Sequence, residues 1–157
     1  MHCLATTRFN TDTWNENKRW RGRNQWNGCV YGTPVRIADK YTPNIYMFIL
    51  EMHNDKNKIK GIGLIRNALV IGEYHNIYSD GNYNRFTYKS KHRIDRRELA
   101  KEDKYVIRVL DALVFKGARH LKRGQGINVV PTWVTANGKI DFIGFFCKLF
   151  RSYSSLK

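Results

Sequence analysis

Two strand-like stretches separated by a polar turn restrict the fold of this chain more than any other feature. Residues 45–52 form a nearly continuous apolar run, and residues 58–65 alternate apolar side chains with polar or small ones. Residues 54–57 between them read Asn-Asp-Lys-Asn, which is typical of a turn. The pattern predicts an antiparallel hairpin. Gly61 and Gly63 share one face of its second strand, where they let another group approach closely.

Helices are predicted on both sides of this hairpin. Thr13 and Glu16 have the spacing of a capping box, which predicts an N-terminal helix over residues 12–21. Farther along the chain, apolar residues recur with the period of a helix face at Val106, Val109, Leu110 and Leu113. This periodicity predicts a second helix over residues 102–116.

The last segment carries two competing patterns. Asn137-Gly138 is a hairpin signature, whereas residues 142–150 place their apolar side chains with helical spacing. We favour a closing helix over residues 139–151. Shorter strands are predicted over residues 2–7, 29–31, 35–37, 71–78 and 85–89.

These elements predict one α+β domain that spans residues 1–157. Its centre is a small mixed or barrel-like β-sheet formed by residues 28–90, with an N-terminal helix and C-terminal helices around it. The chain is 42% hydrophobic, which is enough for a packed core and unlike a disordered basic tail. Its three cysteines include no CxxC pair, which favours reduced thiols over a disulfide framework or a zinc site. We expect no metal and no other cofactor.

The chain shows no pattern of export or of membrane insertion. Its longest nearly apolar run, residues 140–150, is too short to span a bilayer. The first residues lack the basic and apolar regions of a secretory signal. We therefore expect a soluble intracellular protein without a membrane span.

Charge is the strongest indication of function. The chain has 28 Lys and Arg against 13 Asp and Glu, a formal net charge of +15 at pH 7. Residues 17–38 and residues 112–140 each hold five basic side chains and no acidic one. A soluble chain that tolerates so much self-repulsion usually has a polyanionic partner, so we expect it to bind nucleic acid.

Three segments combine features suited to nucleic acid, and each has a structural alternative. Residues 14–26 interleave three tryptophans with cations, so the rings would stack on bases, unless they fill the core. Residues 89–93 would place Lys89, Lys91 and Arg93 on one strand face, along a phosphate backbone or as a charged sheet edge. Residues 115–126 form a basic, glycine-containing loop that would bind phosphates or serve as a solvated connector. The candidate nucleic-acid-binding residues are Trp14, Arg19, Trp20, Arg21, Arg23, Trp26, Lys89, Lys91, His92, Arg93, Lys116, Arg119, His120, Lys122, Arg123 and Gln125.

No motif identifies a catalytic residue, because the five histidines lack HxH, HxE and HExxH spacing. One alternative is an enzyme that modifies or cleaves nucleic acid, a metal-dependent nuclease for example. Its metal would need carboxylates such as Glu51, Asp55, Glu73 and Asp80, which no spacing singles out. Another alternative is a module that binds a host protein through the phenylalanines of the closing helix, namely Phe142, Phe145, Phe146 and Phe150.

Several stretches resemble a family of small proteins encoded by large DNA viruses of eukaryotes, namely residues 13–17, 28–32, 57–65, 83–85 and 115–124. The early strand, the early helix and the KIKGIGLI strand at residues 58–65 are similar to the PUA-like superfamily, which includes the EVE, ASCH and YTH domains. This second resemblance implies a small mixed β-barrel that binds RNA or a modified base in an aromatic-lined pocket, walled here by Trp14 or Trp26. A viral origin would place the protein in the cytoplasm or nucleus of an infected host cell.

Together these features predict a nucleic-acid-binding protein that does not catalyse a reaction. It would read RNA or a modified base with a basic track for the phosphates and an aromatic pocket for the base.

Overall fold

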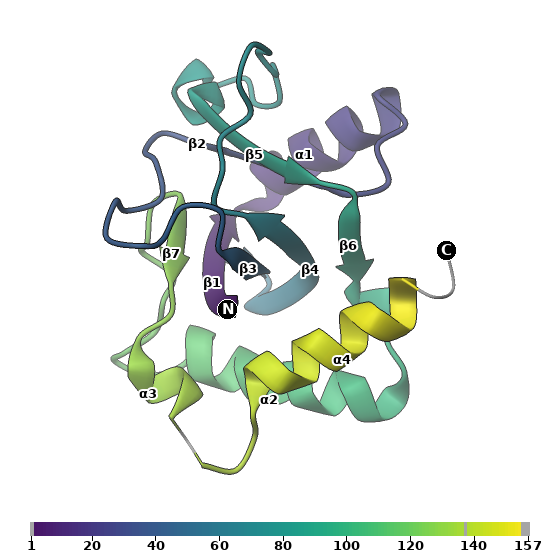
Figure 1. The fold of residues 1–157 in the computed structure, drawn as a ribbon, viewed down its shortest axis with the longest axis vertical. Helices are drawn as coiled ribbons and strands as arrows, with labels where there is room; N and C mark the ends of the chain where they lie inside the picture. The colour runs from purple at the N-terminus through teal and green to yellow at the C-terminus, as the bar shows by residue number, and fades with distance from the viewer. Residues whose placement is uncertain (1, 137, 155–157) are drawn as a thin grey trace.

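The computed structural model describes residues 2–136 and 138–154, which form an α+β fold (Figure 1). Five strands form a mixed sheet in the order β6-β4-β3-β1-β7, namely β1 (His2–Phe9), β3 (Tyr46–His53), β4 (Lys58–Arg66), β6 (His92–Asp95) and β7 (Ile127–Val129). A separate two-stranded sheet pairs β2 (Cys29–Thr33) with β5 (Phe86–Ser90). The helices are α1 (Thr11–Arg23), α2 (Lys101–Phe115), α3 (Thr132–Thr135) and α4 (Phe142–Ser154), with the short 3-10 helices η1 (Gly81–Asn84) and η2 (Arg96–Glu98). The predicted α+β class is confirmed, but the strands form two sheets and not a closed barrel.

The strongest sequence patterns correspond to real elements. β3 and β4 pair antiparallel along their whole length and form the predicted hairpin. The three predicted helices correspond to α1, α2 and α4. The capping box of α1 joins Thr13 to Asn10 instead of Glu16, because Thr13 N donates to Asn10 Oδ1 at 2.8 Å and Asn10 N donates to Thr13 Oγ1 at 3.0 Å.

Two of the short strand predictions are wrong. Residues 35–37 and 71–78 lie in irregular segments, and their apolar side chains Ile37, Ile77 and Tyr78 are buried under the two-stranded sheet without pairing as strands. The sheet also reaches beyond residues 28–90, since β1, β6 and β7 belong to it. The Asn137-Gly138 signature falls partly outside the described residues, because Asn137 is not among them.

The five-stranded sheet is covered on both faces. Figure 1 shows α2 and α4 along one side of the strands, and α1 with β2 and β5 on the opposite side. In β3, Phe48 and Leu50 pack into the core under α2 and α4, whereas Met47 and Ile49 pack into the core under α1 and the small sheet. A strand that is buried on both faces has a nearly continuous apolar sequence, which explains why residues 45–52 do not alternate with polar side chains.

The phenylalanines of α4 belong to the core. Phe142, Phe146 and Phe150 are buried against the sheet and Phe145 packs half-buried beside them. They are therefore not the exposed surface that a module binding a host protein through them would require. Within the part of the chain that the structure describes, no helix is long and apolar enough to cross a membrane.

Candidate nucleic-acid interface

A groove of about 1010 Å³ lies between α1, the β3–β4 turn and the segment from β6 to the start of α2. One helical stripe of α1 forms its first wall, because Thr11, Trp14, Lys18 and Arg21 recur at intervals of three and four residues. The remaining walls come from His53, Lys56 and Lys60 of the hairpin and from residues 93, 95–98 and 104. The fold thus unites three segments that lie far apart in the sequence.

The groove is strongly positive. Its described lining includes two carboxylates, Asp95 and Glu98, and eight cationic side chains, namely Lys18, Arg21, Lys56, Lys60, Arg93, Arg96, Arg97 and Lys104. Burial lowers the pKa of Lys60, and the neighbouring positive charge of Lys56 lowers it further. Burial likewise lowers the pKa of Arg21, with a second contribution from the charge of Arg93. Cations this crowded create a field that attracts polyanions.

Trp14 lies half-buried in the wall of the groove. Its ring meets Phe9 edge-on at a centroid distance of 5.4 Å and lies 6.1 Å from the ring of His53. The guanidinium carbons of Arg21 and Arg93 lie 5.9 and 5.7 Å from the centroid of the indole. Trp14 is therefore an oriented aromatic surface with two cations beside it, a cation–π arrangement.

Trp26 is the second half-buried indole of the groove. Its Nε1 donates to the carbonyl of Cys29 at 3.0 Å, which fixes the ring, and the ammonium of Lys89 lies 4.9 Å from its centroid. Lys89 also pairs with Glu73 at 3.2 Å. Two of the three tryptophans of residues 14–26 are thus placed to meet a ligand.

The third tryptophan of α1 and the following loop, Trp20, is not placed to meet a ligand. It is only 6% exposed and packs in the core beside His75, so the prediction that it stacks on bases is wrong. It occupies the helix face opposite the groove because six residues rotate a helix by about 240°. Arg19 and Arg23 are exposed on α1 but do not line the groove.

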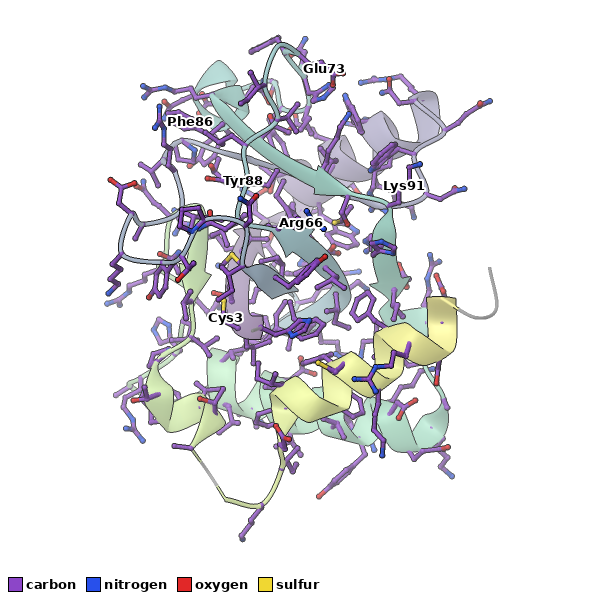
Figure 2. All side chains as sticks on the ribbon, viewed as in Figure 1. Cys3, Arg66, Glu73, Phe86, Tyr88 and Lys91 are labelled. Carbon is purple, nitrogen blue, oxygen red and sulfur yellow. The ribbon has the colours of Figure 1, made fainter. Side chains whose placement is uncertain are left out.

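Residues 89–93 do not form one strand. Ser90 pairs with Cys29 in the small sheet, whereas His92 pairs with Leu64 in the large one. Figure 2 shows Lys91 at the bend between the two strands, and both Lys91 and His92 are exposed. The prediction that Lys89, Lys91 and Arg93 share a strand face is therefore wrong, because the chain changes sheets between them.

Arg93 is instead part of a buried hydrogen-bond network. Its Nη2 donates to Glu51 Oε1 at 2.6 Å, its Nε to Glu51 Oε2 at 3.0 Å, and its Nη1 to Asp95 Oδ2 at 3.3 Å. The hydroxyl of Tyr31 donates to Glu51 Oε2 at 2.6 Å. Burial opposes the charge of Arg93, but the Glu51 carboxylate outweighs that effect and raises the pKa of the guanidinium. Burial, and then the same carboxylate, raise the pKa of Tyr31 well above its ordinary value.

The two glycines of β4 make room for this network. A Cβ at Gly61 would lie 2.5 Å from Arg93 Nη2 and 2.7 Å from Glu51 Oε1. A Cβ at Gly63 would overlap the Tyr31 hydroxyl and lie 2.8 Å from Cys29 Sγ. The close approach predicted from these glycines is therefore made by the protein's own side chains.

The Gly63→Ala variant is expected to lose about 1–3 kcal/mol of unfolding free energy, the usual cost of overpacking a filled core. Gly22→Ala is the matched control, since nothing lies within 4 Å of a Cβ at that position of α1. There alanine favours the helix by up to about 1 kcal/mol. Urea unfolding of the two variants measures both effects, and equal stability of the two would contradict the packing described for Gly63.

Residues 115–126 do not line the groove. The carbonyl of Lys122 accepts a hydrogen bond from Asn54 Nδ2 at 2.9 Å, which attaches the segment beside the β3–β4 turn. The guanidinium carbon of Arg119 lies 4.4 Å from the ring centroid of Trp133. His120 Nδ1 accepts from Lys122 N at 3.2 Å, and the carbonyl of Gln125 accepts from Asn128. Lys116 and Arg123 are exposed, and this connector between α2 and β7 lies outside the groove.

The list of candidate residues leaves out several groove residues, namely Lys18, His53, Lys56, Lys60, Arg96, Arg97 and Lys104. Lys18 was detectable, because it lies four residues after Trp14 and three before Arg21 on the same helix stripe. The hairpin and η2 lie opposite α1 because of the way the sheet packs against that helix. No local sequence pattern predicts this arrangement.

The four carboxylates considered as metal ligands have separate partners. Glu51 binds Arg93, Asp55 accepts from Thr11 N at 2.8 Å, Glu73 pairs with Lys89, and Asp80 caps η1. Across residues 2–136 and 138–154, no group of three His, Cys, Asp or Glu side chains is placed to hold a metal ion. These four carboxylates therefore do not share one site.

His53 gives the fold a pH dependence. Burial lowers its pKa below the ordinary value of 6.5, and the charge of Lys56 lowers it further. As the pH falls from 6.5 to the lowered pKa of folded His53, the unfolded chain takes up this proton before the folded protein does, so stability should fall across that window. Urea unfolding across this range should show a shallower pH slope for His53→Gln than for the wild type, and equal slopes would contradict the assignment.

The groove offers fixed aromatic rings and a high density of cations, a combination suited to a flexible polyanion that carries flat rings. Comparisons with protein-family models, with curated proteins and with solved structures give no match for this chain.

Proposed function

We propose that this protein binds single-stranded RNA, or a strand that carries a modified base, in the groove beside α1, without catalysing a reaction. The observation that carries the proposal is the convergence in one groove of two half-buried indoles and eight cationic side chains, of which Arg93, Arg96 and Arg97 are paired with carboxylates. Cations neutralise phosphates, and each base that stacks on an aromatic ring adds about 1–3 kcal/mol.

The indoles favour an unpaired strand over a duplex. Bases within a duplex are stacked on each other, so a ring in a protein groove reaches them only after they are turned out. Single strands expose their bases without that cost. Trp14 and Trp26 thus support a preference for an unpaired strand, while the cations alone would suit any nucleic acid.

Binding is expected to weaken steeply as salt increases. For single strands the logarithm of the affinity falls by about 0.7 per neutralised phosphate for each tenfold rise in salt, so about six phosphates would give a slope near −4. Fluorescence anisotropy of a short labelled RNA over a salt series measures this slope, with duplex DNA of equal length as the comparison. A slope near zero, or tighter binding of the duplex, would refute the proposal.

A further inference from the structure

We propose that Glu51, buried beneath the groove, is a positioning residue for nucleic-acid binding. It fixes the guanidinium of Arg93 against Trp14 and thereby sets the orientation of that indole in the groove. The inference rests on the function proposed for the groove and assigns a role to a residue that does not itself line it.

Stability alone does not explain why this position holds a carboxylate. Glu51 is 2% exposed and Arg93 is 6% exposed. In β3, Glu51 continues the series of Met47 and Ile49, both of which face the core under α1. Apolar side chains of similar volume usually replace a buried ion pair without loss of stability, and often with a gain. Two apolar residues in place of the Glu51–Arg93 pair would therefore fill this part of the core as well.

The geometry shows what the carboxylate does. Glu51 accepts hydrogen bonds from Nε and Nη2 of Arg93, and Asp95 accepts from Nη1, so all three guanidinium nitrogens are held. Tyr31 in turn holds Glu51 from the small sheet. The guanidinium is thus fixed and cannot turn freely toward a phosphate. It supports Trp14, whose ring centroid lies 5.7 Å from its carbon.

The double variant Glu51→Met with Arg93→Met separates positioning from packing and from charge. It removes one negative and one positive charge, so the net charge stays at the wild-type value, and it keeps an apolar filling in the core. We expect it to resist urea better than Glu51→Met alone, although it still loses the hydrogen bond that the Tyr31 hydroxyl donates to Glu51. Its affinity for the labelled RNA should fall about tenfold, as for the loss of one stacked base, while the slope against salt stays unchanged.

A spectroscopic measurement reports the indole directly. The chain has four tryptophans, so 5-fluorotryptophan labelling gives four ¹⁹F resonances, and the one lost in Trp14→Phe belongs to Trp14. In the double variant the Trp14 resonance should shift while that of the buried Trp20 stays in place. A folded double variant with wild-type affinity and an unshifted Trp14 resonance would overturn the inference.

The Tyr31→Phe variant keeps the proposal testable if the double variant does not fold. It retains both charges and removes one of the hydrogen bonds that hold Glu51. Weaker RNA binding with an unchanged salt slope supports positioning, and unchanged affinity refutes it. Failure of the wild type to bind RNA would end both proposals, whereas wild-type binding that these variants leave intact would end only this one.

Discussion

Replacing Glu51 with alanine is expected to lower the free energy of unfolding by about 3–5 kcal/mol, the largest stability effect of any single substitution discussed here. The substitution leaves the Arg93 guanidinium buried without its main counter-charge, since Glu51 accepts two of its hydrogen bonds. It also leaves the Tyr31 hydroxyl without its acceptor. In urea unfolding the loss should appear as a lower midpoint concentration of urea. The slope of the unfolding free energy against urea concentration should stay unchanged.

Two control variants show whether the loss comes from the unpaired charge. Glu102 is an exposed carboxylate in the first turn of α2, and its replacement by alanine should cost less than about 1 kcal/mol. Adding Arg93→Met to a Glu51→Met variant should recover the part of the stability lost to the unpaired charge, because the buried guanidinium is then gone, while the Tyr31 hydroxyl stays without its acceptor. A loss in Glu51→Ala as small as that in Glu102→Ala would show that the network does not stabilise the fold in the way described.

The hairpin and the long helices were predictable because their evidence is local. The polar turn between β3 and β4 and the spacing of Val106, Leu110 and Leu113 each fit within one short window of sequence. The segments at residues 35–37 and 71–78 are apolar for a different reason. Ile37, Ile77 and Tyr78 fill the core under the small sheet without pairing as strands, whereas Val35, Ile71 and Tyr74 are exposed.

The groove was predictable only in part. The stripe of α1 that carries Trp14 and Arg21 follows from helical periodicity, and the positive charge follows from composition. The partners of that stripe did not follow, since Lys60 and Arg97 reach it only through the packing of the sheet against α1. The role of Arg93 was hidden for a related reason. A basic residue in a strand is usually exposed, and Glu51 comes next to Arg93 only through the registers of β3 and β6 on the two sides of β4.

Cationic side chains in the groove should contribute far more to RNA affinity than the same number of cationic side chains outside it. Lys18, Lys60 and Lys104 come from α1, β4 and α2 and line three parts of the groove. If each of them contacts one phosphate, their joint replacement by glutamine removes three such contacts. At about 0.7 per phosphate, the slope of the logarithm of affinity against the logarithm of salt concentration should become shallower by about 2. The affinities of the wild type and the variant should become equal near 1 M salt, where the electrostatic contribution vanishes. At about 0.1 M salt, the affinity of the variant for RNA should therefore be about a hundredfold lower.

The matched comparison replaces Arg119, Lys122 and Arg123 with glutamine. It removes the same number of charges from the connector, which lies outside the groove. No side chain of the groove lining is removed there, and salt weakens attraction from charges outside the groove, with a screening length of about 10 Å at 0.1 M ionic strength. The connector variant should therefore keep most of the wild-type affinity and slope in the anisotropy measurement. An equal loss in both variants would mean that total charge and not the groove determines binding, and a larger loss in the connector would place the interface there instead.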